Sequence, residues 1–583
     1  GRLAPGRSID DGRVELTGSA SRLAAAYLEN EGWGARAIPL REQLMPADVR
    51  LVVFTMMGAV SLVLLIACAN VANLLLARAT MRQREIAVRA ALGAGRGRIA
   101  RQLLTESVLV ALMSVPIGVA LAYIGLQWLT ASIPPQDAVP YYIDWSMSWR
   151  VVVYAAAVSV ITGLLFGLVP AVHALGPNLH HSLKDGGRSA GAHASRNGLR
   201  NGLVVAEIAL SLVLLVGASL FVRSFLNLQH ANPGFETAPL LTLRVYMAGE
   251  SYAKEDQRAQ RIEDLIRRIE SLPQVEAAFA SNFIPLSSGG GGGGVIIDGK
   301  PVAPGEEPFI FLAGATPHLQ KTMGMPIVKG RDFTEAEGIS RTAVAVINDT
   351  MAARYWPGES AVGRQFRTSW GGQPYQIVGI VSDYKVDTPG ELPKPYLHLP
   401  LSRRDIFANY VIKTTVPAAE LVPALERTVR SLDPDHVFIG TGSLGQLADI
   451  RLFPIQAGAM LIGVFGVLAL ILAAVGLYGV ISYSVSQRIR EIGIRKALGA
   501  ETSQVVRMVM RQGMGLTATG VAVGAALAAL GAQALSSVLL VGAFDLVSFS
   551  VAAAVLLGVA LLANWIPARR AARVNPMLAV KAE

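Results

Sequence analysis

The chain has 583 residues, of which 52% are hydrophobic and 16% are charged. This composition excludes an ordinary soluble protein of the same size, so membrane-spanning helices are the first elements to look for. The formal net charge of +10 would suit nucleic acid or anionic lipid, but the basic residues flank apolar runs, which favours membrane lipid and argues against nucleic acid. The single cysteine, Cys68, lies inside an apolar run and cannot form an internal disulfide.

The chain begins without Met and without the apolar core of a signal peptide, and we interpret it as truncated at its N-terminus. Further along, seven segments are apolar over roughly 20 residues, the length that a helix needs to cross a membrane. These segments are 51–77, 103–131, 151–172, 202–221, 456–483, 513–541 and 546–566.

The basic residues between these spans are unevenly distributed, since neither 102–149 nor 512–568 contains Lys or Arg. Four basic segments contain Arg78, Arg82, Arg84, Arg89, Arg96, Arg98 and Arg101; Lys184, Arg188, Arg196 and Arg200; Arg488, Arg490, Arg495, Lys496, Arg507 and Arg511; and Arg569, Arg570, Arg573 and Lys581. Because basic loops are retained in the cytoplasm, strict alternation of the spans predicts all four on that side. Residues 1–50 and the large insert 225–455 are then predicted outside the cytoplasm, and the chain is predicted to lie in the inner (plasma) membrane.

An internal repeat divides the chain into two tandem units. Residues 84–94 read R-E-I-A-V-R-A-A-L-G-A, and residues 490–500 read R-E-I-G-I-R-K-A-L-G-A. Each copy follows one span and precedes another. In the second unit the three repeated spans are preceded by a further span and a soluble insert, so symmetry predicts that residues 1–50 end the soluble insert of the first unit.

The repeated segment and its place after the span that follows a large insert resemble the macrolide-exporter (MacB-type) and FtsX-like ABC transporter permeases. The doubling resembles the duplicated orphan permease (ADOP) family in particular. Two further segments support this likeness: A-C-A-N-V-A-N-L-L-L-A-R at 67–78 and V-A-V-I-N-D-T-M-A-A-R-Y-W-P at 344–357. The resemblance implies an α-helical polytopic membrane protein with an inserted α+β, porter-like extracytoplasmic domain.

The repeat and the resemblance together predict a domain division of the whole chain. The expected parts are a remnant of the first extracytoplasmic domain (1–50), the first FtsX-like three-helix unit (51–172), a cytoplasmic linker (173–201), a helix opening the second unit (202–221), a MacB-like extracytoplasmic domain (225–455), the second FtsX-like three-helix unit (456–566) and a cytoplasmic tail (567–583).

The repeated segment has the pattern of a short, capped helix. In each copy an acid precedes an Arg by four residues, the favourable order for a helical ion pair, and a Leu-Gly pair then predicts a helix end with Gly in the left-handed conformation. In the family resembled, this region docks on the nucleotide-binding subunit. The resemblance therefore implies an ATPase-coupling role for Arg84, Glu85, Arg89, Leu92, Gly93, Arg490, Glu491, Arg495, Leu498 and Gly499. A basic loop touching only lipid headgroups would explain the arginines, but it would not explain the repeated Glu, Ile, Leu and Gly.

The sequence offers no catalytic, cofactor or metal site. The nearest match to a phosphate-binding loop is 294–301, but Pro301 replaces the required hydroxyl residue, and the preceding V-I-I reads as a strand. The glycine run 289–294 reads more simply as a flexible loop. The histidines show no metal-ligand spacing. We therefore predict a permease without its own nucleotide-binding domain, and not an enzyme.

Four polar residues within the predicted spans are candidates for a functional or interhelical role. An intramembrane carboxylate is by default a functional candidate, but Glu207 lies close to the basic start of its span, which favours snorkelling or pairing with Arg200. Asn70, Asn73 and Asn564 are candidate hydrogen-bond partners between helices. None of them is assigned to a site.

In the insert, the patterns predict helices at 255–272 and 418–432 and strands at 344–347 and 375–381. In 418–432 the residues Leu421, Leu425, Val429 and Leu432 share one face. No convergent polar pocket can be read from the sequence of this domain.

These observations favour a permease that couples ATP hydrolysis by a separate cytoplasmic ABC ATPase to motion of its extracytoplasmic domain, for efflux or mechanotransmission. A periplasmic adaptor or outer-membrane channel is a further candidate partner. Two alternatives remain: an FtsX-like regulatory scaffold that activates an envelope hydrolase, and a permease that extracts lipoprotein or lipid. The sequence names no substrate.

Overall fold

The computed structural model divides the chain into two units. One contains Gly1–Ala47 and Leu226–Pro454, and the other contains Asp48–Phe225 and Ile455–Glu583. The residues that the structure describes are 2–27, 34–40, 42, 47–81, 95–131, 146–174, 190–246, 254–286, 291–298, 307–340, 342–369, 373–401, 407–432, 437–535, 542 and 544–573.

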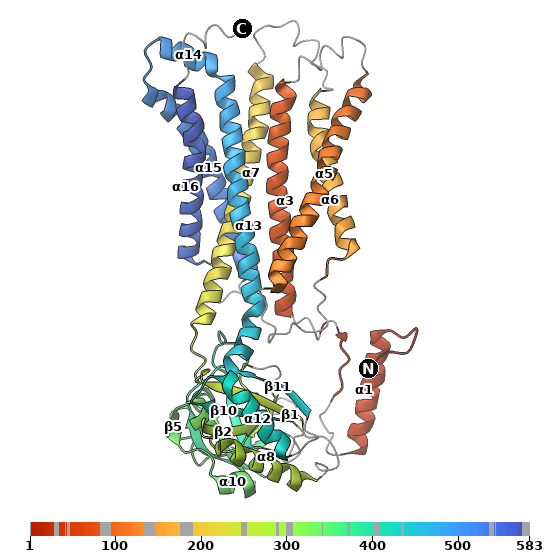
Figure 1. Ribbon diagram of the computed structural model, residues 1–583, viewed down its shortest axis with the longest axis vertical. Helices are drawn as coiled ribbons and strands as arrows, with labels where there is room; N and C mark the ends of the chain where they lie inside the picture. Colours follow the sequence, from red (N-terminus) through yellow and green to blue (C-terminus); the bar gives the residue numbers. More distant parts are fainter. Residues whose placement is uncertain are drawn as a thin grey trace. The chain divides into compact units, whose positions relative to one another are not determined.

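The second of these units is helical and forms the membrane part of the protein (Figure 1). Its helices are α3 (Ala47–Met81), α5 (Arg96–Ala131), α6 (Trp149–Ala174), α7 (Ala190–Gln229), α13 (Leu444–Gln487), α14 (Ile489–Ala497), α15 (Thr502–Ala534) and α16 (Leu546–Ala572). Among the described residues, six helices are long and apolar enough to cross a membrane, and the described apolar part of α6 is shorter, Trp149–Leu164. The predicted polytopic fold is confirmed, although α15 ends before the predicted limit at 541.

Small residues allow four of these helices to pack closely. Gly520 and Gly524 of α15 face α7, and a Cβ at 524 would lie 2.7 Å from the carbonyl oxygen of Ala209. Side chains such as Ile208 and Leu212 of α7 are fully buried in the same core, which α13 and α16 complete. Within a membrane, close contact of this kind replaces the hydrophobic effect as the main source of helix association.

Helix α3 joins this bundle through a smaller apolar cluster. Its residues Ala59 and Ile66 pack against Leu214 of α7 and Ala469 of α13. Helices α5 and α6 pack on each other, and a Cβ at Gly163 of α6 would lie 2.9 Å from the Cβ of Ala111 in α5.

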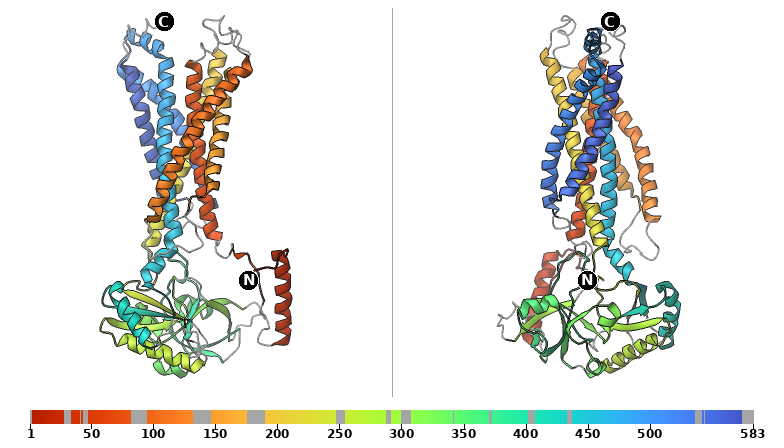
Figure 2. Two further views of the ribbon diagram at one scale, coloured as in Figure 1. Left: turned by 45° about the vertical axis from the view of Figure 1, so that its right-hand side comes forward. Right: turned by 90° about the vertical axis from the view of Figure 1, so that its left-hand side faces the viewer.

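The first unit contains the inserted α+β domain, which has two lobes. The first lobe contains strands β1 (Leu240–Tyr246), β2 (Val275–Ser281), β10 (Phe407–Thr414) and β11 (Val437–Ser443) with helices α8 (Glu255–Glu270) and α12 (Ala418–Leu432). The strands run antiparallel in the order β11-β1-β10-β2. Helices α8 and α12 lie side by side and share one apolar core with these strands (Figures 1 and 2).

The second lobe is inserted between β2 and β10. It contains β3 (Gly291–Ile297), β4 (Phe309–Ala315), α9 (Leu319–Met323), β5 (Ile327–Gly330), α10 (Glu335–Ser340), β6 (Val344–Asn348), α11 (Asp349–Tyr355), β7 (Gln365–Thr368), β8 (Tyr375–Val381) and β9 (Tyr396–Pro400). Strands β4, β3, β7, β8, β6 and β9 follow one another, and the additional β4–β9 pairing closes them into a ring. The expected extracytoplasmic domain was porter-like with an inserted part, and the insertion of this second lobe into the first agrees with that expectation.

The N-terminal region contains one long helix that the sequence patterns did not indicate, α1 (Ile9–Ala26). It begins with a capping box, in which the Ser8 hydroxyl accepts a hydrogen bond from the Asp11 backbone and the Asp11 carboxylate accepts one from the Ser8 backbone. None of its residues is buried. Whether residues 1–50 end a first extracytoplasmic domain stays a prediction.

The prediction of a flexible loop for the glycine run 289–294 is wrong for 291–294. These four glycines form the first half of β3 and pair in register with β4, from Gly291 opposite Leu312 to Gly294 opposite Phe309. A Cβ at Gly292 would meet the Phe309 ring at less than 3.0 Å. The glycines therefore serve close packing within a strand, which composition alone does not distinguish from a loop.

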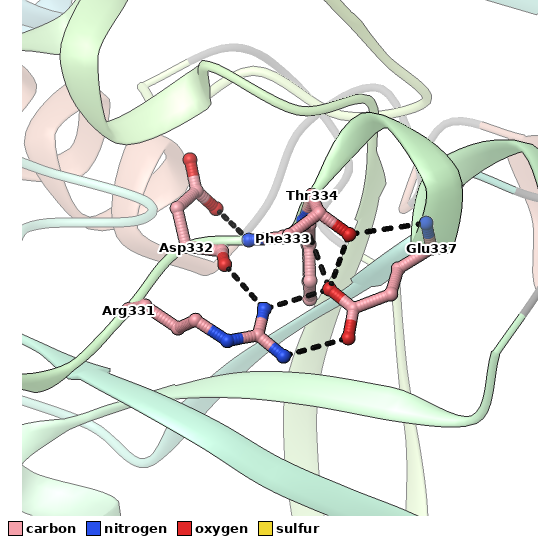
Figure 3. A network of polar contacts seen from close by, with 5 residues as sticks. All are labelled: Arg331, Asp332, Phe333, Thr334 and Glu337. Carbon is pink, nitrogen blue, oxygen red and sulfur yellow. Dashed lines mark hydrogen bonds and ion pairs between the residues drawn. The ribbon is translucent and has the colours of Figure 1, made fainter.

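A polar network fixes α10 in the second lobe (Figure 3). The Arg331 guanidinium donates to both carboxylate oxygens of Glu337 at 2.7 Å. Glu337 also accepts from the backbone and hydroxyl of Thr334, while its own N–H donates to the Thr334 hydroxyl, which forms a capping box. These contacts lower the pKa of Glu337 to about 2 from an ordinary value of 4.5, with the Arg331 hydrogen bonds as the main cause.

We expect the stability of α10 to depend on pH through this network. Because the folded pKa of Glu337 lies below its ordinary value, its stabilising contribution is complete above pH 4.5 and is lost as pH falls toward 2. Solvent screens the pair, so about 1 kcal/mol is expected. Hydrogen exchange of the α10 amides, corrected for intrinsic rates, should show protection falling across this window in the wild type but not in Glu337→Gln. Parallel curves for the two proteins would contradict this assignment.

Candidate functional site

Helix α14 contains residues 490–497 of the second copy of the repeated segment and lies in sequence between α13 and α15. The Arg495 guanidinium pairs with the Glu491 carboxylate at 2.6 Å, and both side chains are about half exposed. The spacing of four residues predicted this ion pair, and the structure contains it. At an exposed helical position such a pair contributes a few tenths of a kcal/mol.

The end of α14 is a tight turn that only Gly adopts easily. Gly499 has a φ of +95°, its N–H donates to the Lys496 carbonyl, and the Ala500 N–H donates to the Arg495 carbonyl at 3.0 Å. This pair of hydrogen bonds is a Schellman motif. The predicted left-handed Gly is therefore present, and the turn leads directly into α15 at Thr502.

One face of α14 is fixed to the membrane bundle. Ile492 is buried in the same apolar cluster as Val505 of α15 and Ala568 of α16. The Lys496 ammonium donates to the carbonyl oxygen of Ala572 at 2.6 Å, close to the end of α16. Helix α14 is thus held by α13 through the chain, by α15 through packing and by α16 through a hydrogen bond.

The other face of α14 is open. Leu498 is 82% exposed and Ile494 is 46% exposed, next to the Glu491–Arg495 pair. Exposed apolar side chains beside charged groups are typical of a surface that contacts another protein or a membrane. Helix α14 therefore combines a rigid attachment to the bundle with an available contact face.

The structure places only part of the predicted coupling set. Glu491, Arg495, Leu498 and Gly499 lie together on α14 and its end, and Arg490 lies in α14, with its side chain outside the described part. The predicted coupling residues of the first copy lie outside the described part of the chain. They are Arg84, Glu85, Arg89, Leu92 and Gly93.

Sequence reasoning missed the roles of Ile492 and Lys496. Lys496 occupies the position of Ala90 in the first copy, so the difference between the copies was the available signal. Its partner, the Ala572 carbonyl, is a backbone group far along the chain, which no sequence motif marks.

A second polar site lies inside the bundle. The Asn70 amide of α3 donates to the Glu207 carboxylate of α7 at 2.6 Å and to the Leu472 carbonyl of α13 at 2.9 Å. Glu207 is 1% exposed. The interhelical role proposed for Asn70 is confirmed. The expectation that Glu207 snorkels or pairs with Arg200 is wrong, because Glu207 is buried and the Arg200 guanidinium lies 4.0 Å from the centre of the Tyr483 ring.

The other two asparagines differ from each other. The Asn564 amide donates to the Ala560 carbonyl of its own helix and, at 3.9 Å, to the Met514 sulfur of α15, which is the interhelical role expected of it. The Asn73 amide is buried and has no hydrogen-bond partner within the described part of the chain.

Models of two protein families together match most of the chain. Residues 57–179 and 463–576 match the family model described as FtsX-like permease C-terminal, and residues 202–432 match that of the MacB-like periplasmic core domain. The two FtsX-like matches contain the two copies of the repeated segment.

Curated relatives are similar over about half of the chain. It is 25% identical over 285 residues to the pyoverdine export ATP-binding/permease protein PvdT of Pseudomonas entomophila (strain L48), covering 47% of this chain and 43% of that protein. It is 28% identical over 285 residues to the macrolide export ATP-binding/permease protein MacB of Shewanella sp. (strain W3-18-1), covering 46% of this chain and 43% of that protein. The chain thus spans less than half the length of these relatives.

Among solved structures, the chain is similar to the periplasmic region of MacB from Actinobacillus actinomycetemcomitans. The identity is 14%, the match covers 37% of this chain and 93% of that one, and the TM-score is 0.26, which does not by itself establish a common fold. The family matches are those of a transporter membrane subunit and not of a catalytic enzyme. With two FtsX-like segments, a MacB-like core domain and helices fit to cross a membrane several times, the chain belongs to the MacB-like ABC transporter permeases.

Proposed function

We propose that this permease converts ATP hydrolysis by a separate ABC ATPase into movement of its inserted domain. Family membership implies an ABC ATPase as partner. The observation that carries the proposal is α14, a capped helix with one face fixed to α15 and α16 and with Leu498 exposed on the other. In this proposal both copies of the repeated segment, the linker and the C-terminal tail face the cytoplasm, and the inserted domain faces the outside of the inner membrane.

A contact on α14 has a continuous covalent path to the inserted domain. Helix α13 runs without interruption from Gln487 back to Leu444, and Leu444 is buried in a core of the inserted domain. The helix follows directly after β11, which ends at Ser443. A displacement of α14 by a docked ATPase would therefore act on α13 and, through it, on β11.

Export is the first candidate for the work done by this movement. The relatives PvdT and MacB are named as export proteins for pyoverdine and macrolide. Most of the described buried side chains between α7, α13, α15 and α16 are apolar or small, with separate polar groups such as Glu207, Thr517 and Asn564 among them. This favours transmission of force to the inserted domain over passage of a substrate between these helices.

The test is recovery of an ABC ATPase with the full-length, affinity-tagged protein from native membranes. We expect the double variant Arg89→Glu with Arg495→Glu to reduce the recovered ATPase by more than about ten-fold, because reversal of charge on a contact surface is strongly unfavourable. The variant Arg573→Glu, which reverses a charge at the end of α16 outside the repeated segment, should retain the ATPase.

A swap variant separates contact from helix stability. Glu491→Arg combined with Arg495→Glu restores an intrahelical ion pair but exchanges the charges that α14 presents. If α14 contacts the ATPase, the swap should bind it as poorly as Arg495→Glu alone. Recovery of an envelope hydrolase without any ATPase would overturn the proposal in favour of a regulatory scaffold.

A further inference from the structure

The inserted domain contains a cavity of about 210 Å³ between α8, the turn from β4 into α9, and α10. All of its lining residues belong to this one unit. Its apolar surface is formed chiefly by Ile262, Ile266, Ala278, Ala315, Pro317 and Leu401. Concave sites with an apolar floor and a few polar groups are the usual form of small-molecule sites.

The walls of this cavity are held in place by separate interactions. Helix α8 is anchored by Ile262, Leu265 and Ile269, which are buried in the first lobe. On the opposite side, α10 is anchored by the bidentate Arg331–Glu337 pair and the Thr334 cap (Figure 3). The cavity is therefore formed without a ligand, which lowers the conformational cost of binding.

The turn between these walls is unusually constrained. His318 lines the cavity and has a φ of +74°, a conformation that residues other than Gly rarely adopt. The Asp332 carboxylate accepts a hydrogen bond from the His318 backbone, which holds this conformation. Gly338 of α10 packs against Pro317, since a Cβ at 338 would lie 3.0 Å from the proline ring. Backbone strain of this kind is retained where the surrounding structure fixes it, and it often marks a binding site.

The rim of the cavity is acidic. Three carboxylates line it, those of Glu263, Glu270 and Glu335, against one guanidinium, that of Arg267, which is already paired with Asp264. The Glu270 carboxylate is oriented by a hydrogen bond from the Ala278 backbone at 3.1 Å and lies 3.9 Å from the His318 ring. Within the described part of the domain, no side chain pairs with Glu335.

We propose that this cavity binds a small organic cation, with a compact apolar body on the floor and an ammonium group between Glu270 and Glu335. The apolar floor accounts for the body, the acidic rim for the charge, and the fixed walls for a limited size. An anionic ligand of the same shape would face three carboxylates and is disfavoured. The site lies within the inserted domain, so binding does not depend on an ATPase partner.

The test uses three probes with the same apolar cage: 1-adamantylammonium, 1-adamantanol and 1-adamantanecarboxylate. Binding to the detergent-solubilised full chain is followed by saturation-transfer difference NMR, with competition to obtain affinities. We expect the ammonium compound to bind most tightly and the carboxylate most weakly. Each pair between the ligand ammonium and an exposed carboxylate should account for about a two- to five-fold change in affinity.

Two kinds of variant locate the binding. Glu270→Gln and Glu335→Gln keep the side-chain shape and should each weaken the ammonium compound about two- to five-fold while leaving the alcohol unchanged. Ala259→Trp fills the cavity and should abolish the binding of all three probes. Glu359→Gln removes a carboxylate elsewhere in the domain, one paired with Arg364, and should change nothing. Equal affinity of wild type for the ammonium compound and the alcohol, or unchanged binding to a folded Ala259→Trp protein, would overturn the proposal.

Discussion

We expect the variant Gly476→Ala to lose thermal stability in the membrane unit, because the added methyl group falls on the buried polar site between α3, α7 and α13. A Cβ at 476 would lie closer than 3.0 Å to Asn70 Oδ1 and to both carboxylate oxygens of Glu207. Neither side chain can move into solvent, since Asn70 is 7% and Glu207 1% exposed. Overpacking of such a site costs about 1–3 kcal/mol. Heating followed by fluorescence-detected size-exclusion chromatography measures the loss.

A matched control lies one turn further along the same helix. A Cβ at Gly479 would meet nothing within 4 Å, and Ala is the better helix former, so Gly479→Ala should be as stable as wild type or slightly more so. Combining Gly476→Ala with Asn70→Ala should recover part of the loss, because it removes one of the clashing side chains. If Gly476→Ala melts like Gly479→Ala, the three helices do not meet as described.

Local patterns predicted a minority of the helices and strands of the inserted domain. Helix α12 spans the predicted 418–432, with Leu421, Leu425 and Val429 buried on one face, and strand β8 spans the predicted 375–381. Helix α12 could be found because one of its faces is buried, which imposes a period of 3.6 on the sequence, whereas β8 could be found as a continuous apolar run because 377–381 are all buried. The V-I-I half of β3 was predicted as a strand, but its glycines have no side chains to show a pattern, so 291–294 were predicted as a loop.

In the membrane unit, the helices and local contacts could be predicted from the sequence, but the polar contacts between distant helices could not. The charge pattern and the apolar runs predicted its helices, and a spacing of four predicted the Glu491–Arg495 pair. Snorkelling or pairing with Arg200 was predicted for Glu207 because Arg200 is near in sequence, whereas its partner Asn70 lies 137 residues away. Contacts between distant helices depend on how the helices pack, and a single sequence does not contain that packing in readable form.

In the inserted domain, we expect Gly379→Ala to separate β5 from β8. Gly379 pairs with Gly330 in the register of these strands, and a Cβ at 379 would lie closer than 3.0 Å to the backbone carbonyl oxygen of Arg331. A side chain could rotate away, but this carbonyl moves only if β5 moves. The cost is about 3 kcal/mol, at the upper end of the usual range for overpacking. Hydrogen exchange of the full chain should show lost protection over 327–340.

The displacement should extend from β5 to the cavity through Arg331. This residue follows β5 directly and pairs with Glu337, which fixes α10 as one wall of the cavity (Figure 3). Gly379→Ala should therefore weaken adamantylammonium binding as well as β5 protection, while Gly291→Ala, whose added Cβ would meet only the Leu312 carbonyl at 3.6 Å, should leave both unchanged. Loss of protection in β5 with unchanged binding would mean that α10 holds its position without Arg331, and retained protection in β5 would contradict the register itself.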